Sequence, residues 1–268
     1  MNTSVENDAV YVTKQDGVAT LWLNRPAKRN AITNEMWQAI GDRVNGLRED
    51  TDVRLLILRG VGDHFCAGAD IHGLAEMSLR EYHEANQYAD QSLATFPMPT
   101  IAFITGSCIG GGAELASCCD LRIAAEGSKY GITPARLGII YPAYALERVT
   151  RLIGPSATKQ LLFTGDIIEA NEALRMGLIN ELLPLDAAEN RLEGLVSTLL
   201  ERSLLTQVGT KEMVEQIADA GQVSDSLNER WHDIIDTAAD MHEGIAAFAD
   251  KRKPSFSWRP TQAGASDR

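Results

Sequence analysis

Three consecutive glycines, residues 110–112, constrain the fold of this chain most, because they separate a strand pattern from a helix pattern. The apolar run 100–104 predicts a buried strand, and the run 114–118, which begins with Glu114, predicts a helix. Glycine has no Cβ, so a substrate can approach this backbone closely. The first amides of a helix have no partner within it and can stabilise a developing oxyanion. The alternative is an ordinary strand-to-helix turn in which Glu114 favours the positive end of the helix.

A second loop of small residues follows another predicted strand. Residues 64–71, which read His-Phe-Cys-Ala-Gly-Ala-Asp-Ile, come directly after the strand-like run 54–60. Open α/β sheets bind ligands beyond the carboxyl ends of their strands, where both loops are expected to lie. Amides from two such loops can hold one carbonyl oxygen, and we expect Ala69 and Gly111 to be the pair.

With both loops considered together, the sequence resembles the crotonase, or enoyl-CoA hydratase/isomerase, superfamily. The motifs run in order from about residue 10 to residue 256, and the ordered set is far more specific than any one of them. They are Ala-Gly-Ala-Asp-Ile at 67–71, Gly-Gly-Gly-Ala-Glu-Leu-Ala at 110–116, Cys-Asp-Leu-Arg-Ile-Ala-Ala at 119–125, Leu-Phe-Thr-Gly-Asp at 162–166, the run 170–180, Glu-Gly-Ile-Ala-Ala-Phe at 243–248 and Lys-Arg-Lys-Pro at 251–254.

The resemblance implies an α/β fold, with a crotonase-like core of repeated ββα units and a helical C-terminal region used for trimerisation. We therefore expect a homotrimer or a dimer of trimers. The pattern divides the chain into a core over 1–200, a helical region over 201–258 and a flexible tail over 259–268. The amphipathic stretch 224–239 suits either a subunit interface or an ordinary helix facing the core.

Local patterns place the remaining elements. Residues 15–17, Gln-Asp-Gly, predict a hairpin turn, and Asn34 predicts the N-cap of a helix that runs towards Glu49. The chain from Leu185 onward is almost entirely helical in pattern. The predicted strands are 10–13, 18–23, 54–59, 100–104 and 121–124, and a further helix is predicted over 78–94.

Charge and composition exclude several classes of function. A net charge of −12 with a pI near 4.9 argues against a general nucleic-acid surface. The start of the chain lacks a signal-peptide pattern and no apolar run is long enough to span a membrane, so we expect a soluble cytoplasmic protein without membrane association. The four cysteines show no metal-ligand spacing and are expected to be buried thiols, although Cys66 or Cys108 could instead be a nucleophile beside the predicted site.

The resemblance implies an acyl-CoA substrate and an enolate held at the thioester oxygen by the amides of Ala69 and Gly111. The loop 24–31 matches the family's first CoA-binding loop, where Lys28 or Arg29 would meet the nucleotide. The expected coenzyme A contacts are Lys28, Arg29, Ala67, Asp70, Ile71 and Lys251, the last on a neighbouring subunit. Without the resemblance, the basic cluster at 251–253 is expected to be an ordinary solvent-exposed face. No cofactor is expected beyond the coenzyme A of the substrate, since the dinucleotide pattern G-x-G-x-x-G is missing.

The acid and base residues determine which reaction the enzyme catalyses. Hydratases of this family use two glutamates, and Glu114 occupies the position of the first. The second belongs in a segment of the form F-G-x-P-E-x-x-L-G, but residues 130–138 place Pro134 there, and proline cannot exchange a proton. The expected enzyme is therefore a lyase of the enoyl-CoA hydratase or isomerase type, in fatty acid metabolism, with Glu114 as its only carboxyl acid/base.

Two other functions remain open. Thr133 and Tyr141 resemble the subgroup that contains methylmalonyl-CoA decarboxylase, in which a threonine and a tyrosine face the substrate's carboxylate. That subgroup carries a histidine where this chain has Ala69. Thr133 also suits a turn cap before Pro134, and Tyr141 a packing side chain. The second alternative is that the chain is a non-catalytic binding protein with the same fold.

Overall fold

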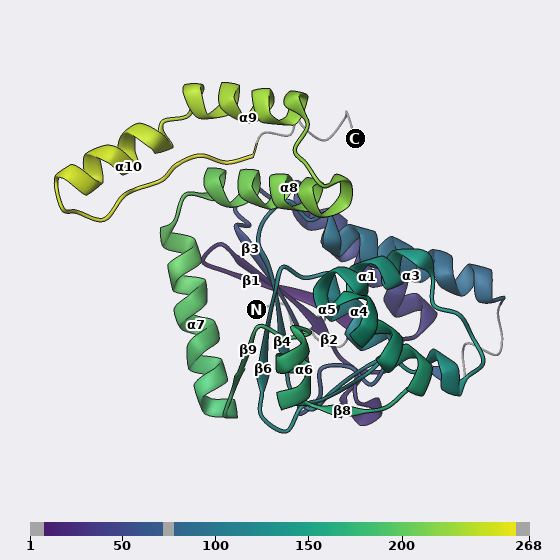
Figure 1. Cartoon of the computed structure of the whole chain (residues 1–268). Helices are drawn as coiled ribbons and strands as arrows, with labels where there is room; N and C mark the ends of the chain where they lie inside the picture. The colour runs from purple at the N-terminus through teal and green to yellow at the C-terminus, as the bar shows by residue number, and fades with distance from the viewer. Residues whose placement is uncertain (1–7, 72–77, 261–268) are drawn as a thin grey trace.

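A computed structural model describes residues 8–71 and 78–260 (Figure 1). Its main sheet has the strand order β1-β2-β3-β4-β6-β9, in which β1 and β2 are antiparallel and every later neighbour is parallel. The hairpin predicted at residues 15–17 is confirmed, with Asp16 and Gly17 both at positive φ. The strands are β1 (Val10–Gln15), β2 (Val18–Leu23), β3 (Leu55–Gly60), β4 (Thr100–Ile104), β6 (Leu121–Ala125) and β9 (Glu181–Leu183).

Helices cover both faces of this sheet. In Figure 1, α7 lies against one face, while α1, α3, α4 and α5 lie on the other side. Leu55 and Ile57 of β3 face α7, and the alternate residues Leu56 and Leu58 belong to the larger core. Coverage of both faces explains why the central strands are apolar without interruption. The helices are α1 (Asn34–Arg48), α3 (Leu79–Ala94), α4 (Gly111–Ser117), α5 (Ala143–Thr164), α6 (Ala170–Met176) and α7 (Leu185–Glu201), with short 3₁₀ turns η2 (Pro26–Lys28) and η3 (Pro134–Arg136).

The helix α1 is capped by Thr33, so the prediction that Asn34 is the N-cap was wrong. The Thr33 side chain accepts a hydrogen bond from the amide of Met36, and its backbone is extended. Asn34 is already the first helical residue. An N-cap needs an extended backbone with its side chain turned back on the helix, and in this sequence two adjacent residues were chemically suited to that position.

A second, smaller sheet forms beside the glycine run. It consists of β5 (Ser107–Ile109), β7 (Lys129–Gly131) and β8 (Ile168–Glu169), with β5 and β7 parallel. The sequence placed 107–109 in the turn, because three residues are too few to show a strand period. The helix α4 begins at Gly111, three residues earlier than predicted, so two of the three glycines are helical.

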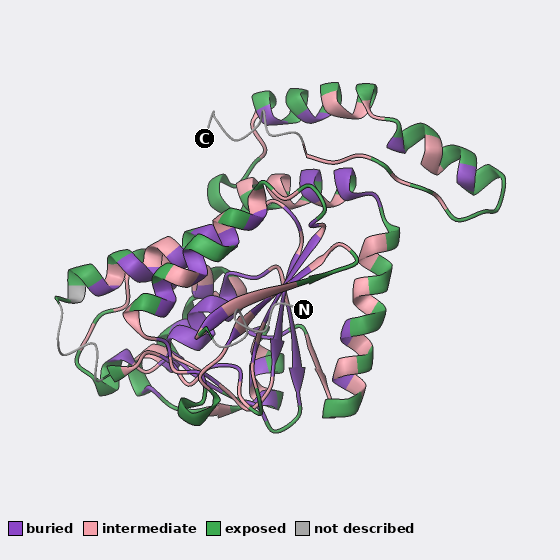
Figure 2. Cartoon of the chain, turned by 180° about the vertical axis from the view of Figure 1, so that it is seen from behind, coloured by how far each residue is buried: buried purple, intermediate pink, exposed green. Residues whose placement is uncertain are grey.

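The C-terminal region is helical, as expected. It contains α8 (Leu204–Ala220), α9 (Asp225–Thr237) and α10 (Asp240–Ala249). In Figure 2, α9 and α10 are mostly exposed on their outer sides and extend away from the sheet. Leu227 and Trp231 of α9 are buried against the chain's own core. The domain boundaries and the use of this region for trimer assembly remain predictions. Within the described ranges, no helix is both long and apolar enough to cross a membrane.

Candidate active site

The two loops that the sequence singled out lie against each other. The amide of Cys66 donates to the carbonyl of Ser107 at 2.8 Å, and the amide of Ile109 donates to the carbonyl of Cys66 at 3.0 Å. A Cβ placed on Gly111 would lie 3.8 Å from the amide nitrogen of Ala69. The structure therefore brings the predicted amide pair together.

Each loop reaches this arrangement through a glycine at positive φ. Gly68 has a φ of 104° and Gly110 a φ of 54°. A Cβ on Gly68 would meet the carbonyl oxygen of Ile109 at 3.0 Å, so the loops could not approach as closely with a larger residue there. Across residues 8–71 and 78–260, neither the amide of Ala69 nor that of Gly111 donates a hydrogen bond. Two unused donors at one point form a suitable site for an oxyanion.

A cavity of about 90 Å³ opens beside these amides. Its walls include Thr133, Tyr141 and the apolar side chain of Ile139. Thr133 is the N-cap residue of η3, although its side chain forms no capping hydrogen bond. Tyr141 contributes to two cavities, this one and a smaller one of about 10 Å³.

Glu114 lies in the wall of the smaller cavity rather than the larger one. Its side chain is buried, and neither carboxyl oxygen has a hydrogen-bond partner among the described residues. Burial, followed by the charge of Asp90, raises the pKa of Glu114 well above its ordinary range. Tyr141 lines both cavities, so it borders Glu114 on one side and the larger cavity on the other.

Asp90 on α3 is a buried carboxyl that sequence reasoning did not single out. Its side chain is fully buried, and its two oxygens lack hydrogen-bond partners in the described chain. Burial raises the pKa of Asp90 to about 6, while Glu114 and the guanidinium of Arg148 act in the opposite direction. The sequence feature that could have identified Asp90 is its position on the apolar face of its helix, next to Ala89 and near Leu93.

The predicted coenzyme A loop packs against the 64–71 loop. The amide of Ala67 donates to the carbonyl of Arg29 at 2.9 Å, and Arg25 forms an ion pair with Asp70 at 3.0 Å. Lys28 and Arg29 are exposed at the end of η2. Ala67 and Ile71 line the larger cavity, and Ile71 is 58% exposed. Two of the predicted contacts thus line the cavity, and the loop that carries Lys28 and Arg29 is joined to the 64–71 loop by these two bonds.

Lys251 is not part of this group within one chain. It follows α10, which lies across the molecule from α3 and α4 in Figure 1. Its neighbours are already paired, since Arg252 binds Glu243 at 2.6 Å and Lys253 binds Glu201 at 2.7 Å. A contact from Lys251 to coenzyme A bound at this site would have to come from another subunit.

The alternative of a cysteine nucleophile gains no support here. No group of three or more potential metal-binding side chains occurs among the residues that the structure describes. All four cysteines are buried thiols, and burial raises the pKa of Cys66 to about 12. Burial also raises the pKa of the Cys108 thiol, so neither cysteine is a nucleophilic thiolate at neutral pH.

Comparison with known proteins identifies the family. The family model for enoyl-CoA hydratase/isomerase matches residues 13–259. The chain belongs to this family. The crotonase resemblance and the α/β fold with a helical C-terminal region are thereby confirmed.

Relatives match over nearly the whole chain. Crotonyl-CoA hydratase from Syntrophomonas wolfei is 34% identical over 256 residues, which is 92% of this chain and 97% of that protein. 2,3-Dehydroadipyl-CoA hydratase from Escherichia coli is 30% identical, over 93% of this chain and 99% of that protein. A crystal structure of an enoyl-CoA hydratase/isomerase family member has a TM-score of 0.87 at 36% identity, over 94% of this chain and 99% of that one. An enoyl-CoA hydratase/carnithine racemase from Magnetospirillum magneticum has a TM-score of 0.89 at 30% identity, over 93% and 96%.

Proposed function

We propose that this member of the family acts on short-chain acyl thioesters of coenzyme A, as a hydratase or isomerase. The amides of Ala69 and Gly111 stabilise the enolate oxygen, and Glu114 is the carboxyl acid/base. The supporting observation is that Tyr141 lines both the small cavity that holds the buried, unpartnered carboxyl of Glu114 and the larger cavity beside the two unused backbone donors. The cavity of about 90 Å³ favours a short acyl chain.

In hydration, water adds to the β-carbon of the enoyl thioester and the electron pair of the double bond moves to the thioester oxygen. The two amides stabilise that charge, and removal of one such donor from an enzyme can cost roughly 3–4 kcal/mol of transition-state stabilisation. Glu114 then gives its proton to the α-carbon, and the proton lost by the water returns to Glu114. Because Tyr141 lines both cavities, its hydroxyl group carries protons between Glu114 and the substrate. This chemistry requires no group beyond the coenzyme A of the substrate.

Coenzyme A binding involves the exposed loop and the mouth of the cavity. Lys28 or Arg29 meets the phosphates, and the substrate passes Ala67 and Ile71 in the cavity wall and Asp70 beside them. Lys251 reaches the same ligand from a neighbouring subunit of a homotrimer or a dimer of trimers. The net charge of −12 makes such local cations necessary for binding a polyanion.

One observation favours a second candidate, decarboxylation of a malonyl-type thioester. The larger cavity is lined by Thr133 and Tyr141 but not by Glu114. In this reaction the bond to the carboxylate breaks, CO₂ leaves, and the electron pair forms the same enolate at Ala69 and Gly111. Thr133 and Tyr141 would orient the departing carboxylate, and a proton would then be added to the α-carbon.

The experiment compares wild type, Glu114→Gln and Tyr141→Phe on crotonyl-CoA and methylmalonyl-CoA, with hydrated product and CO₂ measured separately. Glu114→Gln keeps the size of the side chain and removes the acid/base, so we expect hydration to fall roughly 10²–10⁴-fold. Glu147→Gln is the matched control, because Glu147 is exposed on α5. The hydratase proposal is wrong if wild type hydrates nothing, and its CO₂ release survives Glu114→Gln but falls with Tyr141→Phe. No turnover of either thioester would favour a binding protein.

A further inference from the structure

Three polar side chains at intervals of four residues lie along the buried face of α3. They are Tyr82, Asn86 and Asp90, with exposed fractions of 8%, 1% and 0%. Residues four apart lie on one face of a helix. This face runs from the larger cavity beside the two amides, called the acyl cavity below, towards Glu114 on α4, and Tyr82 and Asn86 line that cavity. This row of side chains ends at Asp90, whose carboxyl group the proposed mechanism does not use.

Two buried carboxyl groups without donors are unstable if both are charged. Asp90 and Glu114 affect each other's pKa through charge and through contact between the carboxyl groups, although no hydrogen bond of ordinary length and angle joins them. An ionised carboxyl can only accept hydrogen bonds, whereas a protonated one supplies a donor. A single proton in the pair therefore provides the missing donor and removes the repulsion between like charges.

The groups around the pair determine which carboxyl keeps the proton. Burial is the main influence on both carboxyls, and Arg148 on α5 is the cation that lowers the pKa of Asp90. No cation lowers the pKa of Glu114 among the influences resolved for it. The other titratable side chains near the pair carry no positive charge: Tyr82 on α3, Cys118 on α4, Tyr141 before α5, Tyr144 on α5, and Cys66. Asp90 is thus the favoured site of the negative charge and Glu114 that of the proton.

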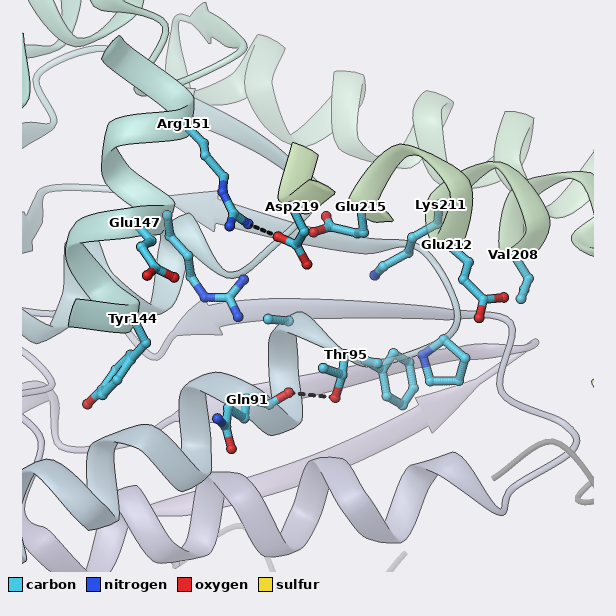
Figure 3. A pocket seen from close by; sticks show the side chains of 14 residues that line it. Gln91, Thr95, Tyr144, Glu147, Arg151, Val208, Lys211, Glu212, Glu215 and Asp219 are labelled. Carbon is cyan, nitrogen blue, oxygen red and sulfur yellow. Dashed lines mark hydrogen bonds and ion pairs between the residues drawn. The ribbon is translucent and has the colours of Figure 1, made fainter. Parts of the chain in front are cut away.

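Arg148 also connects this pair to solvent. It lines an open cavity of about 300 Å³ between α3, α5 and α8, together with Gln91, next to Asp90, and Tyr144 (Figure 3). This cavity and the acyl cavity have no lining residue in common. Arg148, the cation that acts on Asp90, therefore borders this open cavity, whereas Glu114 borders the small cavity that shares Tyr141 with the acyl cavity.

We propose that Asp90 is a positioning residue that shares one proton with Glu114, and that this pair supplies the second carboxyl that Pro134 excludes from the acyl cavity. Asp90 does not touch the substrate. It retains the negative charge beside Arg148, which keeps the proton on Glu114 ready for transfer to the α-carbon. The inference rests on the proposed function for its catalytic meaning, but the shared proton itself is a property of the folded chain.

Carbon-13 NMR of the carboxyl groups tests the shared proton without any substrate. In protein labelled at the Asp and Glu side-chain carboxyls, we expect one glutamate signal that is still protonated at pH 7 and is missing in Glu114→Gln. In Asp90→Asn this signal should titrate at a pH lower by about one unit or more, because the neighbouring negative charge is gone. A Glu114 signal that is already ionised at pH 7, or one whose titration is the same in Asp90→Asn, would refute the inference.

The pH profile of kcat/KM tests the positioning role. In Asp90→Asn the limb that belongs to Glu114 should move to lower pH by about one unit or more, whether Glu114 acts as acid or base. Asp90→Glu should restore the wild-type limb. Asp240→Asn is the control, because Asp240 is another buried carboxyl, held by Ser203 on the far side of the molecule from the acyl cavity. If the pH profile of folded Asp90→Asn is the same as that of wild type, the positioning role is overturned. If NMR shows the shared proton but the protein turns over no thioester, the proposed function has failed instead.

Discussion

Replacing Gly111 with alanine tests the amide pair more sharply than any other single change. The added Cβ would lie 2.8 Å from Cζ2 and 3.1 Å from Cη2 of Trp37, which is fully buried. A contact of 2.8 Å is closer than carbon atoms can approach, so either the indole or the start of α4 must move. The same Cβ would lie 3.8 Å from the amide nitrogen of Ala69, in ordinary van der Waals contact, so a shift of α4 would change the distance between the two donors.

Two separate losses follow from this contact. Overpacking of a rigid core costs about 1–3 kcal/mol of unfolding free energy. Displacement of one oxyanion donor lowers kcat by roughly 10²–10³-fold, with KM much less affected, because the interaction is made in the transition state. Urea unfolding and steady-state kinetics on the best thioester substrate measure the two effects independently.

Gly194→Ala is the matched control for this substitution. Gly194 lies within α7, and a Cβ there would have no atom within 4 Å. Alanine is the better helix former, so this variant should gain about 0.5–1 kcal/mol and retain full activity. The double variant Trp37→Leu with Gly111→Ala should lose less unfolding free energy than the sum of the two single variants, because the smaller leucine removes the clash. If Gly111→Ala keeps kcat within about twofold of wild type, the indole has moved and the amide has stayed in place. Gly111→Pro then decides the question, because proline has no N–H, and a normal kcat in folded Gly111→Pro means that Gly111 does not supply an oxyanion donor.

Two further outcomes follow from buried charge and from the basic loop. Burial raises the pKa of Asp90 in the folded state to about 6, above its unfolded value, so unfolding free energy should fall as pH rises from about 4 to 6. The loss attributable to Asp90 is up to about 3 kcal/mol and should disappear in Asp90→Asn, as measured by urea unfolding across this pH range; an equal slope in both proteins would contradict it. Calorimetry of coenzyme A should show weaker binding and a smaller salt dependence in Lys28→Ala with Arg29→Ala, and also in Lys251→Ala if a neighbouring subunit supplies that lysine. Wild-type affinity that does not change with salt would count against phosphate contacts by these residues.

The sequence predicted the sheet well because its strands are continuous apolar runs between sharp turns. The hairpin, the strand at 100–104 and the helices after Leu185 all appear as predicted. Errors occurred where length or chemistry gave no unique answer. Ser107–Ile109 is too short for a recognisable strand period, and Thr33 and Asn34 are equally able to cap a helix.

The amide pair was predictable because both loops follow strands that neighbour each other, β3 and β4, in a parallel sheet. Parallel strands end at the same edge, so the loops beyond them meet. Asp90 was not predictable in the same way, because a single aspartate on a helix usually faces solvent. Its partner Glu114 lies 24 positions along the chain, and only the packing of α3 against α4 reveals the pair.

The position of the second carboxyl bears on what the acyl cavity can bind. Pro134 is buried and lines the cavity, as does the apolar side chain of Ile139. A glutamate in place of Pro134 would put a carboxyl group in that wall. With the second carboxyl behind Glu114 on α3, the wall stays uncharged, and the unused amides of Ala69 and Gly111 remain the strongest polar feature that a thioester would meet. An apolar short acyl group would then meet no charge in that wall, so selectivity among such groups should depend on size rather than on charge.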